Sequence, residues 1–389
     1  MEGDFIKINS WLLPFSWLYG CGVKLRNFLF DVGILKSRSF KTPIISVGNL
    51  TVGGTGKTPH TEYLVELLKQ QLNVAVLSRG YKRKSKGFLI ANEHTTARDI
   101  GDEPFQMKRK YPNITVAVDK DRVHGIEMLT KQRKDIDVIL LDDAFQHRFV
   151  KPGVNILLVD YHRLIIYDKL MPAGRLREPQ SGKNRADIVI VTKCPKALKP
   201  MEFRVITKAM SLFPYQTLFF TKLAYEDMHP LFGNDHKRSI EDIKPDEHVM
   251  LLTGIASPRQ LIEDLTPYTS NLTPLSFSDH HDFKQKDVQQ INDTFAALPA
   301  PKFIITTEKD AARLLETEGL SDEVRKHIYY LPVKIEFMLD QQNSFNENIL
   351  GYVRKNSRDS ILAKTKDDHK PENGNSSGDR PRTISFRNN

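Results

Sequence analysis

The sequence contains very little cysteine, and this excludes two common kinds of protein. Of the 389 residues only two are cysteine, Cys21 and Cys194. Two cysteines cannot build a disulfide scaffold, and these two lack the paired spacing of a structural zinc site. We therefore expect a protein of a reducing, cytosolic compartment.

A long hydrophobic run is also missing, although the N-terminus is rich in apolar residues. Residues 8–23 carry no charge, but they fall short of the roughly 18 residues of a membrane-spanning helix. Aromatic residues are frequent here and basic residues follow closely, as is typical of segments at a lipid–water interface. We expect residues 1–40 to lie on an anionic membrane surface as an amphipathic segment; the alternative is an apolar helix packed on the core. The aromatic residues are Phe5, Trp11, Phe15, Trp17 and Tyr19, and the basic residues are Lys24, Arg26, Lys36, Arg38 and Lys41.

Acidic residues are too few to balance the basic ones. The chain has 57 Lys and Arg residues against 48 Asp and Glu residues, which gives a formal charge of +9. Such an excess fits nucleic acid, an anionic membrane surface or a phosphorylated substrate as partner. Because the basic residues are dispersed and the sequence shows no RNA- or DNA-binding motif, we expect no nucleic-acid partner.

Short, nearly continuous apolar runs recur along the chain and predict an α/β fold. Such runs are typical of parallel strands that helices bury on both faces. Helical spacing between them predicts helices over residues 58–71 and 122–134. The first series of runs occupies residues 43–50, 73–80, 114–119, 137–143, 154–160 and 186–193, and a second occupies 217–224, 248–256, 273–279, 301–310 and 328–337.

The two series predict two α/β lobes, with a boundary where Pro195 and Pro200 interrupt the pattern. After the N-terminal segment we expect a core lobe over residues 41–200 and a second, smaller lobe over residues 201–355. Residues 356–389 are rich in Asn, Ser, Gly, Pro and charge, so we expect a disordered tail.

The strongest local motif is SVGNLTVGGTGKTP, residues 46–59. An apolar strand runs into a glycine-rich loop and then into a helix, which is the arrangement of a phosphate-binding P-loop. Lys57 would neutralise phosphate charge and the Thr58 hydroxyl would bind Mg²⁺. Thr51 stands where the usual pattern has its first glycine, and a glycine turn with a surface lysine is the alternative. The expected nucleotide contacts are Thr51, Val52, Gly53, Gly54, Thr55, Gly56, Lys57 and Thr58.

The run DVILLDDAFQH ends a buried strand in two acids, Asp142 and Asp143. A carboxylate at this point of a P-loop protein binds the Mg²⁺ of the nucleotide; solvated loop acids are the alternative. The sequence VTKCP resembles the start of a guanine-reading motif, but Pro195 stands in place of its aspartate. We therefore expect ATP and not GTP.

Three further clusters carry groups suited to catalysis. They are GDEP at residues 101–104, LREP at 176–179 and SDHHDF at 278–283. Clustered Asp, Glu and His side chains suit proton transfer or metal binding. Each is equally well explained as a capped loop when it is taken alone.

Taken in order, the motifs resemble one family, the tetraacyldisaccharide 4′-kinases of lipid A synthesis in Gram-negative bacteria. The resemblance extends over residues 5–337. It implies a P-loop kinase at the cytoplasmic face of the inner membrane that transfers the γ-phosphate of ATP to the 4′-hydroxyl of a tetraacyldisaccharide 1-phosphate. The motifs that carry it are GNLTVGGTGKTP, GDEP, DDAFQH, LMPAGRLREP, LLTGIASP, FSDHHDF and TTEKDAARL.

The resemblance also implies roles for single residues. Asp102 would accept the proton of the 4′-hydroxyl, and His280 would pair with it, although His281 stays open as the alternative. Asp142, Asp143 and Glu178 would bind Mg²⁺ together with Thr58. Arg122 and Arg177 are candidate phosphate contacts, because the planar guanidinium can bond phosphate through two hydrogen bonds.

Two other functions compete with the kinase. A P-loop ATPase or GTPase switch would hydrolyse nucleotide without a sugar acceptor. A membrane-binding protein without catalysis would keep the loop only for its structure. Protein partners are not indicated by any motif.

Overall fold

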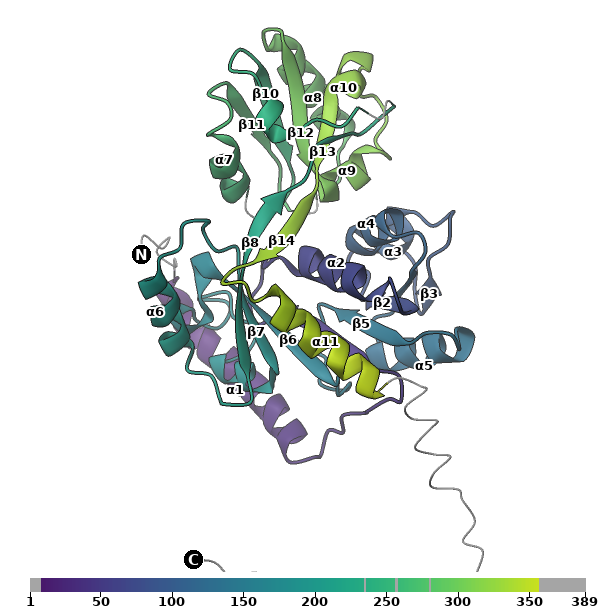
Figure 1. The fold of residues 1–389 in the computed structure, drawn as a ribbon, viewed down its shortest axis with the longest axis vertical. Helices are drawn as coiled ribbons and strands as arrows, with labels where there is room; N and C mark the ends of the chain where they lie inside the picture. Colours follow the sequence, from purple (N-terminus) through teal and green to yellow (C-terminus); the bar gives the residue numbers. More distant parts are fainter. Residues whose placement is uncertain (1–7, 234–235, 256–257, 280, 357–389) are drawn as a thin grey trace, which may run out of the picture.

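The apolar runs of the sequence fold into two mostly parallel sheets, each covered by helices on both faces (Figure 1). The computed structural model describes residues 8–233, 236–255, 258–279 and 281–356. The expected α/β fold with a second, smaller lobe is confirmed.

The larger lobe is built on a nine-stranded sheet. It is parallel from β8 to β4, and an antiparallel strand closes each edge. The central strands are buried along their whole length, which explains their continuous apolar character. In spatial order the strands are β14 (Val333–Phe337), β8 (Thr217–Tyr225), β7 (Ile188–Thr192), β6 (Val154–Asp160), β1 (Ile44–Asn49), β5 (Val138–Asp142), β2 (Val74–Ser78), β4 (Thr115–Val118) and β3 (Leu89–Ile90).

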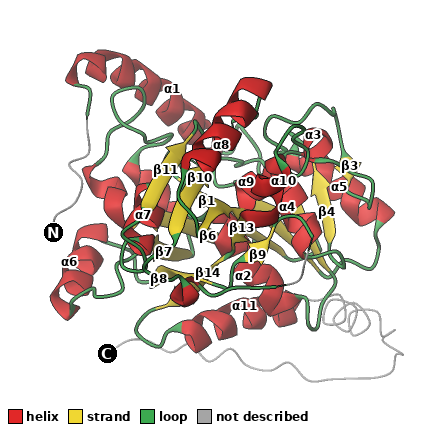
Figure 2. Cartoon of the chain, turned by 90° about the horizontal axis from the view of Figure 1, so that it is seen from above, coloured by secondary structure: helices red, strands yellow, loops and turns green. Residues whose placement is uncertain are grey.

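Helices cover both faces of this sheet. Leu64 of α2, Met107 of α4 and Phe345 of α11 share one apolar core with the strands. Ile126 of α5 and Ile206 of α6 belong to cores on the opposite face, where α1 also lies (Figures 1 and 2). The helices are α1 (Leu13–Asp31), α2 (Lys57–Leu68), α3 (Ala97–Ile100), α4 (Asp102–Lys110), α5 (Arg122–Gln132), α6 (Pro200–Met210) and α11 (Gln342–Asn356), with short 3₁₀ turns at Ser10–Leu12, Tyr161–Arg163, Ile165–Tyr167 and Gln180–Arg185.

The smaller lobe repeats the same layering around five strands. Four strands run parallel, and β9 adds an antiparallel edge. Helix α7 packs on one face, and α8, α9 and α10 pack on the other. The strands are β11 (Leu272–Ser276), β10 (His248–Thr253), β12 (Lys302–Thr307), β13 (Ile328–Leu331) and β9 (His229–Pro230); the helices are α7 (Arg259–Leu265), α8 (Gln285–Ala297), α9 (Glu308–Leu314) and α10 (Asp322–His327), with a 3₁₀ turn at Ile240–Asp242.

Two paired strands connect the lobes. The chain leaves the larger lobe along β8 and returns along the antiparallel β14, with Tyr225 opposite Val333 (Figure 1). The passage into the second sheet therefore comes after residue 225, later than the expected boundary at 200. Helix α11 then packs on the larger lobe, because Phe345 and Ile349 complete its core. The expected tail comprised residues 356–389; Asn356 instead ends α11, and residues 357–389 lie outside the described residues.

The N-terminal helix α1 is only lightly buried. Ser16, Gly20 and Phe30 are its buried residues, and the Ser16 hydroxyl donates to the carbonyl of Leu170 at 2.9 Å. Large apolar side chains face outward, with Trp11 90% and Trp17 70% exposed. Within the described part of the chain, no helix combines the length and apolar character needed to cross a membrane.

Candidate active site

The glycine-rich loop lies between β1 and α2, as its sequence predicts. Gly56 ends the loop with φ of +81°, a left-handed conformation that side chains other than glycine rarely adopt. The Asn49 side-chain amide donates to the Thr55 hydroxyl at 2.8 Å and holds the loop closed across its base. This conformation leaves the N-terminal amides of α2 and the Lys57 ammonium beside the space that the loop encloses. A phosphate bound there would meet both the amides and the positive charge.

Neighbouring backbone fixes the outer side of the loop. The Val52 amide donates to the carbonyl of Arg175 at 2.8 Å, and the Arg177 amide donates to Leu50 at 2.7 Å. The Thr192 hydroxyl donates to the carbonyl of Thr55 at 3.0 Å. These contacts come from separate segments, so the loop is shaped before any phosphate binds.

The acid pair lies beside the loop because β5 is the parallel neighbour of β1. The Lys57 ammonium is 3.7 Å from Asp143 Oδ1, and Arg177 Nη1 is 3.4 Å from the same carboxylate. Burial acts to raise the pKa of Asp143, but Lys57 and Arg177 outweigh it and the pKa lies below its usual value. Burial, together with the charges of Glu103 and Asp143, raises the pKa of Asp142 to about 7. The site thus concentrates negative charge that a divalent cation would relieve.

Glu178 forms its hydrogen bonds with residues other than the acid pair, Asp142 and Asp143. Its Oε2 accepts from Arg185 at 2.9 Å and from Asn27 at 3.1 Å. Its buried Oε1 has no hydrogen-bond partner among the described residues. An unpaired, buried carboxylate oxygen fits a cation ligand, although no group of three or more His, Cys, Asp or Glu side chains in the described chain is arranged to hold a metal by itself. A Mg²⁺ ion here would need further oxygen ligands from the nucleotide or from water. Mg²⁺ bound with phosphates normally has such ligands.

Arg122, a candidate phosphate contact, lies buried beside the end of β5. It is 1% exposed, and its guanidinium donates to the backbone carbonyls of Asp119 and Asp142, the latter at 3.1 Å. Burial lowers the pKa of Arg122 to about 10. Arg122 therefore contacts the backbone at the end of β5, whereas Arg177 contacts the side-chain carboxylate of Asp143.

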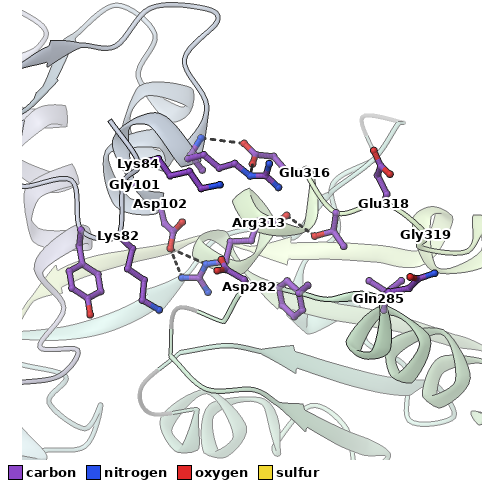
Figure 3. A pocket seen from close by; sticks show the side chains of 16 residues that line it. Lys82, Lys84, Gly101, Asp102, Asp282, Gln285, Arg313, Glu316, Glu318 and Gly319 are labelled. Carbon is purple, nitrogen blue, oxygen red and sulfur yellow. Dashed lines mark hydrogen bonds and ion pairs between the residues drawn. The ribbon is translucent and has the colours of Figure 1, made fainter. Parts of the chain in front are cut away.

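Asp102 begins α4 and lies between the lobes. Gly101 precedes it with φ of +91°, and a Cβ there would come within 2.8 Å of the Tyr81 carbonyl, so the turn requires glycine. Asp102 lines a cavity of about 840 Å³ that also contains Lys82, Lys84 and Asp282 (Figure 3). The cavity is bounded by both lobes and can admit a sugar-sized acceptor.

Asp102 bonds Arg313 of α9, at 2.7 Å. His280, the expected partner, lies outside the described residues. The ring of the alternative, His281, bonds within its own lobe, to Ser278 Oγ at 3.3 Å and to Asp287 at 2.9 Å. Arg313 belongs to the motif TTEKDAARL, which marked the segment but gave no role to this arginine.

A second interlobe cluster was also missed. Lys110 Nζ lies 2.8 Å from Glu62 of α2 and 3.0 Å from Glu308 of α9. These residues come from three helices and no single motif contains them. Only the fold brings them together.

Comparisons with known proteins decide the family. A family model described as tetraacyldisaccharide-1-P 4′-kinase matches residues 8–354. The chain belongs to the tetraacyldisaccharide-1-P 4′-kinase family. Its resemblance to this family, first seen in the motifs, is confirmed.

Individual relatives match over nearly their whole length. The tetraacyldisaccharide 4′-kinase of Phocaeicola vulgatus is 59% identical over 363 residues, which cover 92% of this chain and 99% of the relative. That of Bacteroides fragilis is 53% identical over 375 residues, covering 95% and 100%. The crystal structure of LpxK from Aquifex aeolicus in complex with ATP superposes with a TM-score of 0.68 at 30% identity and covers 88% of this chain and 99% of that one.

Proposed function

We propose that this chain transfers the γ-phosphate of ATP to the 4′-hydroxyl of a tetraacyldisaccharide 1-phosphate, a precursor of lipid A. Membership of the family supports this reaction over a nucleotide-hydrolysing switch and over a protein without catalysis. The Aquifex aeolicus relative was crystallised with ATP, which agrees with the absence of a guanine-reading motif here.

One structural observation carries the proposal. The segment that follows β2 joins two sites: the Ser78 hydroxyl donates to Asp142 Oδ2 at 3.5 Å, and Tyr81 and Lys82, a few residues later, line the interlobe cavity together with Asp102. The cavity that can hold an acceptor therefore adjoins the loop that can hold the nucleotide phosphates. A kinase needs this adjacency, because in-line transfer requires the acceptor oxygen beside the γ-phosphate.

The residues then divide the work of transfer. Lys57 and the N-terminal amides of α2 would neutralise the phosphate charge, since phosphoryl transfer depends mainly on charge stabilisation and alignment. Mg²⁺, when bound, would add further charge neutralisation, and Thr58, Asp142, Asp143 and Glu178 are its proposed ligands. Asp102 would accept the proton that the sugar hydroxyl loses.

The N-terminal segment supports action at a membrane surface, which we propose to be the cytoplasmic face of a bacterial inner membrane. Trp11, Phe15 and Trp17 expose at least 60% of their surface, although burying them inside the protein would be favourable. Aromatic side chains of this kind bind at the level of lipid headgroups, and the basic residues that follow would attract anionic lipid. The enzyme would bind its acylated substrate at this level of the lipid headgroups.

The reaction can be tested by phosphate transfer from labelled ATP·Mg²⁺ to a tetraacyldisaccharide 1-phosphate in detergent micelles. The wild-type chain should label the sugar, and Asp102→Ala should lose at least about 100-fold in rate while it still binds ATP. Transfer that survives in Asp102→Ala would leave the kinase intact but remove its proposed base. ATP hydrolysis without transfer to the sugar would contradict the proposed function.

A further inference from the structure

Arg313 reaches across the gap between the lobes to the start of α4. Its Nε and Nη2 atoms lie 3.0 and 2.7 Å from the same oxygen, Oδ2, of Asp102. The Arg313 side chain is 7% exposed and that of Asp102 is 22% exposed. Figure 3 shows the two side chains pointing toward each other inside the cavity. The contact therefore orders a carboxylate that lines the acceptor cavity.

Arg313 is itself held rigidly from behind. Its Nη1 donates to Asp310 Oδ1 at 2.8 Å and to the carbonyl of Gly254 at 3.3 Å. Asp310 is fully buried and accepts two further hydrogen bonds, from the Gly254 amide at 2.8 Å and from the Thr307 hydroxyl at 2.7 Å. The guanidinium is thus fixed by the smaller lobe independently of Asp102.

The residue type suits this double task. Only a guanidinium presents several donors in fixed directions, so one arginine can bond Asp310 on one side and Asp102 on the other. Arginine also does not release a proton under physiological conditions. It can hold a carboxylate in place without supplying the proton that this carboxylate would have to accept.

Stability alone is a weak reason for such a contact. The attraction between two buried charges offsets little more than the free energy lost when both are removed from water. Apolar residues of similar size are therefore often as stabilising. The pair instead lies on the wall of the cavity, at the carboxylate proposed as the base. We propose that Arg313 is a positioning residue for phosphoryl transfer, which acts through Asp102 by aiming its carboxylate into the acceptor cavity; the inference rests on the proposed role of Asp102 as the base.

The test compares transfer by Arg313→Gln, Arg313→Lys and Asp102→Asn in the full-length chain, with ATP and lipid acceptor varied separately. Arg313→Gln should lower kcat by about 10- to 100-fold, as misplacement of a catalytic group does, with the KM for ATP within about 3-fold of the wild type. Arg313→Lys should recover part of the loss. Arg238→Gln is the matched control, because Arg238 also forms a two-pronged ion pair in the smaller lobe, with Glu247, and does not line the cavity.

A double variant separates positioning from other effects. Adding Arg313→Gln to Asp102→Asn should cause no further loss of kcat, because the residue through which Arg313 acts has already been removed. Additive losses, or full activity of Arg313→Gln, would overturn the proposal while leaving the base in place. Full activity of Asp102→Asn would instead remove the base, and the role of Arg313 with it.

A second double variant tests whether a loss of activity comes only from a loss of folding. Removing Arg313 leaves the buried Asp310 without its cation, so Arg313→Gln is also combined with Asp310→Asn, which removes the unpaired charge. The melting temperature of this double variant should lie near that of the wild type, while its kcat stays low. A stable double variant with wild-type kcat would overturn the proposal.

Discussion

The Lys110 ammonium lies 2.8 Å from Glu62, at the opposite end of α4 from Asp102. The same ammonium lies 3.0 Å from Glu308 of the smaller lobe. Helix α4 is therefore tied at its C-terminal end both to the helix that follows the phosphate loop and to the lobe that bounds the acceptor cavity. One cation between two carboxylates cannot neutralise both charges, so the stability of this cluster depends on pH.

Glu62→Gln should change how stability depends on pH. Burial and the nearby Glu308 raise the pKa of Glu62 from 4.5 to about 7, against the attraction of Lys110. The folded state therefore holds this proton more tightly than the unfolded state, and the contribution is fully present below about pH 4.5 and is lost as pH rises to about 7. Between pH 5 and 8 the melting temperature of the wild type should fall by more than that of Glu62→Gln, by a few degrees.

The control for this experiment is Glu66→Gln, on the same helix. Glu66 is exposed and pairs with Lys69 at the surface. Its substitution should leave the wild-type pH profile unchanged. Parallel profiles for the wild type and Glu62→Gln would mean that Glu62 is ionised over the whole range.

Lys57→Ala should reduce phosphate transfer by about 100- to 1,000-fold, because it removes a fixed positive charge from the developing transition state. It also removes the cation 3.7 Å from Asp143. Lys69→Ala is the matched control, since Lys69 follows α2 directly at its far end. Steady-state rates with saturating lipid would check the difference, and equal rates for the two variants would exclude Lys57 from the chemistry.

Arg185→Met should destabilise the fold by about 3 kcal/mol, because it leaves the carboxylate of Glu178 buried without its cation. Arg133→Met removes an exposed pair with Asp135 and should cost less than about 1 kcal/mol. Urea denaturation of both variants measures the two values. A loss no larger for Arg185→Met than for Arg133→Met would show that Glu178 does not depend on this partner.

Replacing Trp11 and Trp17 together with serine should weaken binding to anionic vesicles by at least about tenfold, because each ring would bury apolar surface in the headgroup layer. Both are at least 70% exposed in the structure. Phe213→Ser changes an exposed aromatic residue outside this segment and serves as the control. Co-sedimentation with vesicles provides the measurement, and unchanged binding of the tryptophan variant would place the membrane contact elsewhere.

The local elements of the fold could be predicted from the sequence because each is encoded within one short stretch. The run at residues 43–50 became β1 (Ile44–Asn49), and the loop and helix after it followed from Gly56 and Lys57. The acid pair lies beside the loop in the structure because adjacent parallel strands end at the same edge.

Contacts between distant segments could not be predicted in the same way. Asp102 and Arg313 are separated by 211 positions, and no local pattern pairs an acid with one arginine among many. Arg122 shows a related problem, since nothing in its local sequence indicates that the fold buries it at 1% exposure. The charge of a side chain can be read from the sequence, whereas the burial and the neighbours of that side chain depend on the whole fold.

The pairing of β8 with β14 makes the smaller lobe a single insertion into the larger one. Its entry at Tyr225 and its exit at Val333 are opposite each other in one ladder. The strand order of the larger sheet is therefore complete without the inserted lobe. The lobe that supplies Arg313 to the acceptor cavity is attached to the sheet that carries the phosphate loop through one edge ladder, β8 with β14.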